Sequence, residues 1–116
     1  MTLDEGYIKY DIDWTPGPAP DADAALELDA SRRPLFEAGL IGEYRDLGIG
    51  YGNISKRLGT AGQFLISGTQ TGHLATTTPD HYALVTAVDV DANRVSCTGP
   101  VKASSEAMTH AAIYGL

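Results

Sequence analysis

Two adjacent serines, Ser104 and Ser105, stand where a helical pattern begins in the sequence. The first turn of a helix has unpaired backbone N–H groups and the positive end of the helix dipole, which together favour a phosphate or carboxylate. Glycines elsewhere let backbone N–H groups approach an anion closely, and polar side chains add donors. Five further residues have these properties: Gly52, Gly68, Gly72, Asn53 and Thr71. The chemistry predicted from these residue types is the binding of an anion.

The same residues also have structural explanations. Gly and Asn are favoured in turns that need a positive φ, so Gly52 and Asn53 could simply connect two elements. Ser104 and Ser105, followed by the acid Glu106, could simply cap a helix. Either serine could be the N-cap, and Gly115 is suited to end the helix that follows.

The N-terminal segment is expected to form a strand followed by an arm. Residues 7–14 alternate, with one face made of Ile8, Tyr10, Ile12 and Trp14. The sequence TPGPAP at residues 15–20 should break regular structure because it holds three prolines. Residues 1–20 are therefore expected to be a strand and a Pro-rich arm, too short to form a core of their own.

The remaining residues alternate between helical and strand patterns. A helix is expected from Asp21 to about Ala38, either kinked at Pro34 or restarted from Ser31, with Gly39 as its stop. Residues 62–67, 82–90 and 94–97 are typical of strands, and a turn at residues 91–93 suggests a hairpin. This order of elements predicts a mixed α/β or α+β sheet domain.

Composition excludes several function classes. The chain has 116 residues, which suit one small domain, and a net charge of -7, which argues against a broad surface for nucleic acid or an anionic membrane. Its single cysteine, Cys97, allows no intrachain disulfide. There is neither a signal-peptide pattern nor an apolar run long enough to span a membrane. We expect a cytoplasmic protein.

Three motifs in order resemble one family, the class II aldolases and adducins. They are GNIS (residues 52–55), LISGTQTG (65–72) and SSE (104–106) followed by THAAIY, and the resemblance runs from about Leu26 to Tyr114. It implies an α/β fold in three layers (α/β/α) with a mainly antiparallel central sheet. Residues 21–116 would be a truncated, N-terminal portion of that domain.

The resemblance also implies roles for individual residues. The family's loops hold the phosphate of a sugar phosphate, which assigns substrate binding to Gly52, Asn53, Thr71, Gly72, Ser104 and Ser105. At the second loop, Ser67–Gly68 is the competing match for Thr71–Gly72. Glu106 matches the family's acid/base residue, which moves a proton during aldol cleavage.

The family uses zinc, held by histidines on later strands, including an H-x-H pair. None of His73, His81 and His110 matches a ligand position, so we expect no metal ligand within this chain. His110 is expected to pack or to form a hydrogen bond on its side of the helix. The resemblance implies a homotetrameric, zinc-dependent lyase, or an epimerase, acting on a small phosphorylated or carboxylated sugar. The alternative is a non-catalytic truncated or adducin-like member that binds an anionic ligand or a protein partner.

Overall fold

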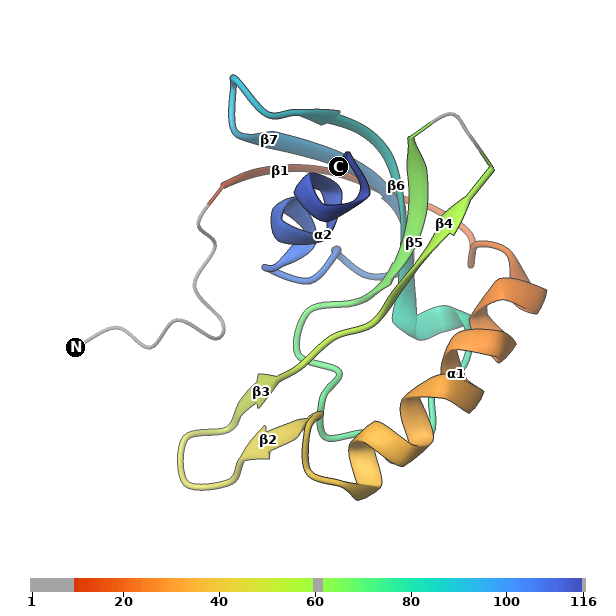
Figure 1. Ribbon diagram of the computed structural model, residues 1–116, viewed down its shortest axis with the longest axis vertical. Helices are drawn as coiled ribbons and strands as arrows, with labels where there is room; N and C mark the ends of the chain where they lie inside the picture. Colours follow the sequence, from red (N-terminus) through yellow and green to blue (C-terminus); the bar gives the residue numbers. More distant parts are fainter. Residues whose placement is uncertain (1–9, 60–61, 116) are drawn as a thin grey trace.

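The centre of the protein is a five-stranded sheet (Figure 1). The structure is a computed structural model that describes residues 10–59 and 62–115. The strand order is β1-β7-β6-β5-β4, and a separate two-stranded sheet is formed by β2 and β3. The elements are β1 (Asp11–Pro16), α1 (Ala22–Glu37), β2 (Gly42–Tyr44), β3 (Ile49–Tyr51), β4 (Ser55–Leu58), β5 (Gln63–Ser67), a 3-10 turn η1 (Pro79–His81), β6 (Tyr82–Asp89), β7 (Arg94–Gly99) and α2 (Ala107–Tyr114).

The sheet is mainly antiparallel. Strands β4, β5, β6 and β7 pair antiparallel in sequence order, with an irregularity in β6 between Val85 and Ala87. Strand β1 is the exception, because it pairs parallel to β7 from Asp11↔Arg94 to Pro16↔Gly99. The three strands expected at residues 62–67, 82–90 and 94–97 are confirmed as β5, β6 and β7, and the mixed α/β content is confirmed with them.

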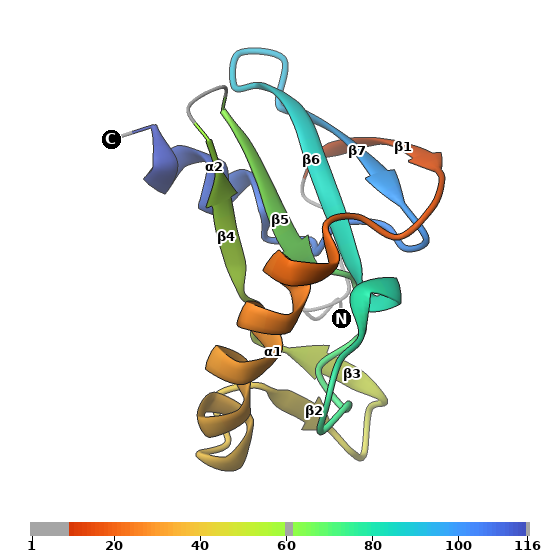
Figure 2. The same cartoon turned by 90° about the vertical axis from the view of Figure 1, so that its right-hand side faces the viewer.

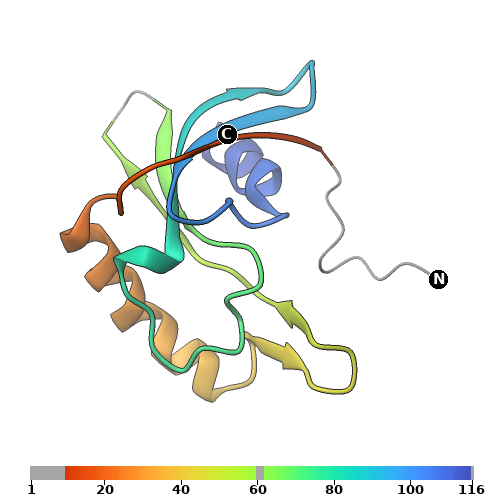
Figure 3. The same ribbon diagram turned by 180° about the vertical axis from the view of Figure 1, so that it is seen from behind.

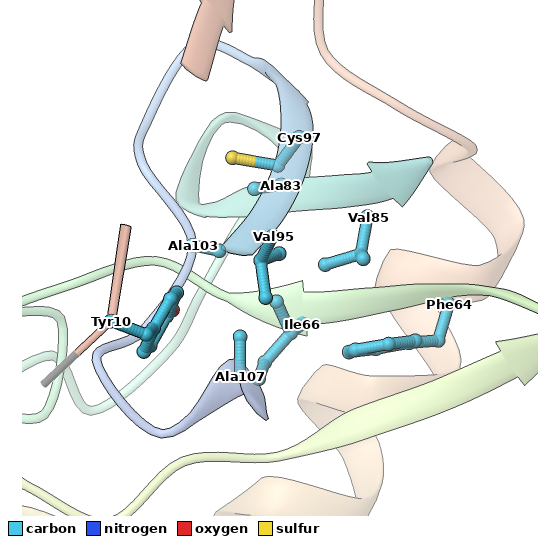
Figure 4. Close-up of a cluster of buried hydrophobic side chains, with 9 residues drawn as sticks. All are labelled: Tyr10, Phe64, Ile66, Ala83, Val85, Val95, Cys97, Ala103 and Ala107. Carbon is cyan, nitrogen blue, oxygen red and sulfur yellow. The ribbon is translucent and has the colours of Figure 1, made fainter. Parts of the chain in front are cut away.

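Each face of the sheet packs against one helix (Figure 2). Side chains alternate along a strand, so Phe64 and Ile66 of β5 point to one face and Leu65 points to the other. The first face forms a cluster with α2 through Ala107 (Figure 4). The second face packs on α1 through Ala24, Ala25 and Leu28. The core therefore has two parts, one on each side of the sheet.

Helix α1 is continuous through Pro34, so of the two alternatives the restart from Ser31 is wrong. Proline removes the hydrogen bond to the carbonyl four residues earlier, here that of Ala30. Both Ala30 and Pro34 are exposed, so water can hydrate this carbonyl. Asp21 caps the start by accepting from the Ala24 N–H at 3.1 Å. Gly39, with φ of +78°, ends the helix as expected.

The N-terminal strand extends further than expected. It continues through Pro16, whereas the sequence suggested that residues 15–20 break regular structure. Strand β1 lies at an edge of the sheet, where a residue without an N–H is tolerated. Figure 3 shows β1 running beside β7. The expected strand residues 7–9, including Ile8, lie outside the described residues.

A small hairpin made of β2 and β3 was not anticipated. Its strands have three residues each, pairing Gly42↔Tyr51 to Tyr44↔Ile49. The rings of Tyr44 and Tyr51 lie 4.8 Å apart. The second strand of the hairpin ends at Tyr51, directly before Gly52. The GNIS loop thus lies between β3 and β4.

Helix α2 begins later than expected. Its N-cap is Glu106 rather than Ser104 or Ser105, and Gly115 is its C-cap as expected. The two serines form a turn before the helix, in which the Ala107 N–H donates to the Ser104 carbonyl at 3.0 Å. No helix in the described part of the chain is long and apolar enough to cross a membrane.

Candidate functional site

Ser67, the last residue of β5, connects two of the three motifs. Its N–H donates to the Ile54 carbonyl at 2.9 Å, and its hydroxyl accepts from the Ile54 N–H at 3.1 Å. Its carbonyl accepts from the Ser104 N–H at 3.1 Å. The GNIS loop and the SSE turn, 50 residues apart in sequence (54 to 104), are therefore fixed to the same residue.

Gly68 extends this junction. It forms a β-bridge with Ala103, and its N–H donates to the His81 carbonyl at 2.8 Å. A Cβ at Gly68 would lie 2.5 Å from a methyl of Val101. A glycine is needed here because the segment before the SSE turn packs directly on it. The Ser67–Gly68 step is thus in direct contact with the SSE segment.

Thr71 and Gly72 lie farther along the same loop. The Thr71 hydroxyl donates to the Gly68 carbonyl at 2.9 Å, which ties this step to the previous one. A Cβ at Gly72 would lie only 2.2 Å from the Gly42 carbonyl oxygen and 3.0 Å from that of Tyr51. The need for glycine at residue 72 therefore has a packing cause, the close approach of the β2–β3 hairpin.

Gly52 and Asn53 follow the hairpin. Gly52 has φ of +80°, and a Cβ there would lie 2.5 Å from the Leu40 carbonyl oxygen. Both conformation and space therefore require glycine, as the turn explanation supposed. Asn53 is half-buried, and its Oδ1 contacts Nε2 of His110. The loop is thereby joined to α2 as well as to β5.

The SSE turn is largely enclosed. Ser104 and Ser105 are both buried, and the Ser104 carbonyl accepts from the Tyr10 hydroxyl at 2.6 Å. The Ser104 hydroxyl accepts from the Glu106 N–H at 3.2 Å, which is a side-chain turn before the helix. Glu106 is half-buried, and its Oε2 accepts from Thr109 at 3.3 Å. The carboxylate is accessible and bound only through this one hydrogen bond among the described residues.

A hydrogen-bonded chain of side chains joins α2 to β4 and the GNIS loop. Nδ1 of His110 lies 2.6 Å from the Ser55 hydroxyl, which lies 2.5 Å from the Tyr114 hydroxyl. Burial lowers the pKa of His110, and the neighbouring Glu106 raises it by less. The expected hydrogen bond of His110 is therefore present, and burial favours the neutral form of the ring.

Ser55 and Tyr114 were not singled out from the sequence. Tyr114 follows His110 by four residues, which places both on one side of a helix, and this spacing was the available signal. Ser55 ends the GNIS motif but was considered only as part of it. Nothing local in the sequence indicates that β4 lies beside α2.

No group of three or more His, Cys, Asp or Glu side chains that could hold a metal ion occurs within residues 10–59 and 62–115. Both ring nitrogens of His110 are already engaged, and Nδ1 of His81 accepts from the Thr78 N–H at 2.9 Å. A catalytic zinc normally has three protein ligands. These residues therefore do not form a zinc site by themselves, and Glu106 is the motif residue that could contribute one ligand.

The three motifs do not line the apolar pocket beside α2. That pocket has a volume of about 420 Å³ and is lined by Arg57, Gly59, Gly62, Gln63, Phe64, Val88, Val90, Ala111, Tyr114 and Gly115. None of the residues given a substrate-binding or acid/base role from the sequence is among them. The candidate site is therefore the junction around Ser67, where the three motifs meet.

Comparisons with known proteins agree with the motifs. No curated protein and no solved structure matches the chain. A family model described as the class II aldolase and adducin N-terminal domain matches residues 38–116, which include all three motifs. The match leaves out all of α1 and all of β1. The chain therefore belongs to the class II aldolase and adducin family, as the N-terminal portion of its domain.

Proposed function

We propose that this chain binds the phosphate or carboxylate of a small sugar at the junction of its three motifs, as part of a zinc-dependent aldolase. The supporting observation is that Ser67 is hydrogen-bonded to both Ile54 and Ser104. Backbone N–H groups and neutral side chains from the GNIS and SSE segments then lie on either side of one residue. Such groups bind anions without a basic side chain.

The binding residues proposed are Gly52, Asn53, Ser104 and Ser105, together with the loop from Ser67 to Gly72. Within that loop we favour the Ser67 hydroxyl for contact with the ligand, because it accepts from the Ile54 N–H and its own hydrogen remains to donate. The N–H groups of Ser67 and Gly68 are already bound to the Ile54 and His81 carbonyls. The hydroxyl of Thr71 is occupied by the Gly68 carbonyl, and Gly72 is packed against the hairpin. Thr71 and Gly72 then stabilise the loop and do not contact the ligand.

Glu106 is proposed as the acid/base residue. It is half-buried, it follows Ser105 directly, and it stands at the N-cap of α2. A carboxylate in this position can take a proton from, or return one to, a substrate whose anionic group is held by the serine turn. The described residues assemble no zinc ligand set, so the roles proposed for them are anion binding and proton transfer.

Family membership also favours a three-layer α/β/α domain and a homotetramer, and both are proposed here. The packing of α1 and α2 on opposite faces of the sheet supports the layered arrangement. A sedimentation experiment on the chain reports its oligomeric state directly.

Inorganic phosphate is the probe for the binding step. In a ¹⁵N-labelled sample, phosphate should shift the backbone N–H signals of Asn53, Ser105 and Glu106. Ser105→Ala should weaken binding several-fold, whereas Ser96→Ala in β7 removes the same hydroxyl outside the junction and should not. Shifts confined to surface Lys and Arg residues, with none at the junction, would overturn the proposal.

Glu106→Gln separates binding from chemistry. The amide keeps the size of the side chain but cannot accept a proton. In the chain fused to the zinc-binding histidine segment of a family member, phosphate binding should therefore persist in the variant while aldol cleavage is lost. A wild-type fusion that binds both phosphate and zinc yet cleaves no sugar phosphate would reject the aldolase role. It would leave the anion site standing as a binding site alone.

A further inference from the structure

We propose that His110 is a positioning residue that turns the amide group of Asn53 so that its NH2, and not its oxygen, faces the anion. This inference rests on the anion site proposed above. It concerns the contacts among Asn53, His110, Ser55 and Tyr114, which lie beside that site. An amide NH2 attracts an anion, whereas an amide oxygen in the same place repels it.

The donor and acceptor of each hydrogen bond between Asn53, His110, Ser55 and Tyr114 follow from the Asn53 contact. Oδ1 of Asn53 carries no hydrogen, so Nε2 of His110 must donate to it. A neutral imidazole has one N–H, so Nδ1 is an acceptor and the Ser55 hydroxyl donates to it at 2.6 Å. The Ser55 oxygen can then accept from the Tyr114 hydroxyl at 2.5 Å. Each of these hydrogen bonds thus has one defined donor.

The neutral state of His110 is consistent with its surroundings. Burial lowers the pKa of His110, and Glu106 on the same helix opposes this more weakly. At the Tyr114 end of these hydrogen bonds, the guanidinium of Arg57 in β4 lies 4.9 Å from the centre of the Tyr114 ring and donates to the Tyr114 carbonyl at 2.7 Å. The guanidinium therefore holds Tyr114 in place.

The contact with His110 determines which polar atom of the Asn53 side chain is available to a ligand. Since Oδ1 is taken by His110, the amide nitrogen is the polar atom of the side chain that remains for a ligand. Asn53 directly precedes Ile54, whose N–H and carbonyl are both bound to Ser67. A donor at residue 53 therefore lies next to the junction where the anion is proposed to bind.

The tautomer of His110 provides a test that needs no ligand. In ¹⁵N-histidine-labelled wild-type protein at pH 7, long-range ¹H–¹⁵N spectra should show His110 with a protonated Nε2 and an unprotonated Nδ1. A protonated Nδ1 with a bare Nε2 would require Asn53 to donate its NH2 to the ring. That result would overturn the inference, because the oxygen would then face the ligand.

Variants test the consequence for binding. His110→Leu removes the donor to Asn53 and should weaken phosphate binding about tenfold. His110→Gln keeps an N–H donor of similar reach and should restore part of the loss. His73→Leu removes an exposed histidine elsewhere and should leave binding unchanged. Thermal unfolding of each variant shows whether it is folded at the temperature of the titration.

The outcomes separate this inference from the function on which it rests. If wild-type protein binds no phosphate, the proposed function fails, and the tautomer still decides the direction of the His110 contact. If wild-type and His110→Leu proteins bind phosphate equally, the inference fails while the anion site remains. Partial rescue by His110→Gln together with the Nε2–H tautomer would support it.

Discussion

Nη1 of Arg32 donates a hydrogen bond of 2.6 Å to the backbone carbonyl of Leu74, 42 residues later in the chain. Nη2 donates to the Thr71 carbonyl at 3.0 Å and contacts that of Gly72. Arg32 is only 1% exposed, and burial lowers its pKa. Helix α1 therefore holds the long loop between β5 and β6 through a buried cation that is bound to carbonyls.

Replacing Arg32 should destabilise the whole fold. Arg32→Met fills similar space but leaves buried carbonyls without a donor, so we expect a loss of about 3 kcal/mol in the free energy of unfolding. Arg45→Met removes the same charge from an exposed residue and should change it by less than about 0.5 kcal/mol. Urea denaturation compares the two, and equal losses would contradict the role given to Arg32.

Asp29 should make stability depend on pH. Burial raises its pKa, but hydrogen bonds from the N–H and hydroxyl of Thr77 and from Arg33 outweigh this, and the net pKa is lowered. A lowered pKa in the folded state means that the stabilisation is complete above the unfolded-state pKa and is lost as pH falls through the folded value.

The measurement compares wild-type protein with Asp29→Asn in urea at several pH values. Wild type should be more stable by about 2 kcal/mol at pH 7, because hydrogen bonds to a charged group are lost in the variant. The difference should shrink below about pH 4, the ordinary range of an aspartate. A difference that stays constant down to pH 2 would be incompatible with this explanation.

Gly72 should tolerate no side chain. In Gly72→Ala the new Cβ would overlap the Gly42 carbonyl oxygen at 2.2 Å, so the hairpin or the loop must move. We expect a loss of at least about 2 kcal/mol in the free energy of unfolding. Gly48→Ala is the control, because Gly48 has φ of +63° but open space around it. This substitution should lower the free energy of unfolding by about 1 kcal/mol. A larger loss at residue 48 than at residue 72 would argue against the packing shown here.

Cys97 should be unreactive in the folded protein. Its side chain is 2% exposed, and burial raises the pKa of the thiol, so little thiolate forms near neutral pH. A thiol reagent such as Ellman's reagent should react at least about a hundredfold faster in denaturant than in buffer. Fast labelling of native protein would place Cys97 at an accessible position instead.

The sequence was sufficient to predict elements with a strong local pattern. Strands β5, β6 and β7 and both helices were expected because their patterns repeat over enough residues to stand out. The β2–β3 hairpin was missed because a three-residue strand such as Ile49–Tyr51 has no visible alternation. The alternative of a restart at Ser31 was wrong because a helix can run through Pro34 where the Ala30 carbonyl faces water, and that is a property of the packed helix.

The candidate site, too, could be predicted from the sequence only in part. Its motifs are continuous stretches of sequence, so Asn53, Ser104 and Glu106 could be named in advance. The contacts that join them could not, because they depend on which strands become neighbours. The hydrogen bond between Ser55 and His110 spans 55 residues, and no local spacing encodes it.

The parallel pairing of β1 with β7 has a consequence for synthesis on the ribosome. Strand β1 is made before the strand with which it pairs, because β7 begins only at Arg94. At translation rates of about 5–20 residues per second, several seconds pass before β7 exists. During that time the edge of β1 has no strand to pair with. The five-stranded sheet therefore cannot be completed before β7 has been made, and until then β4, β5 and β6 are the strands that can pair antiparallel.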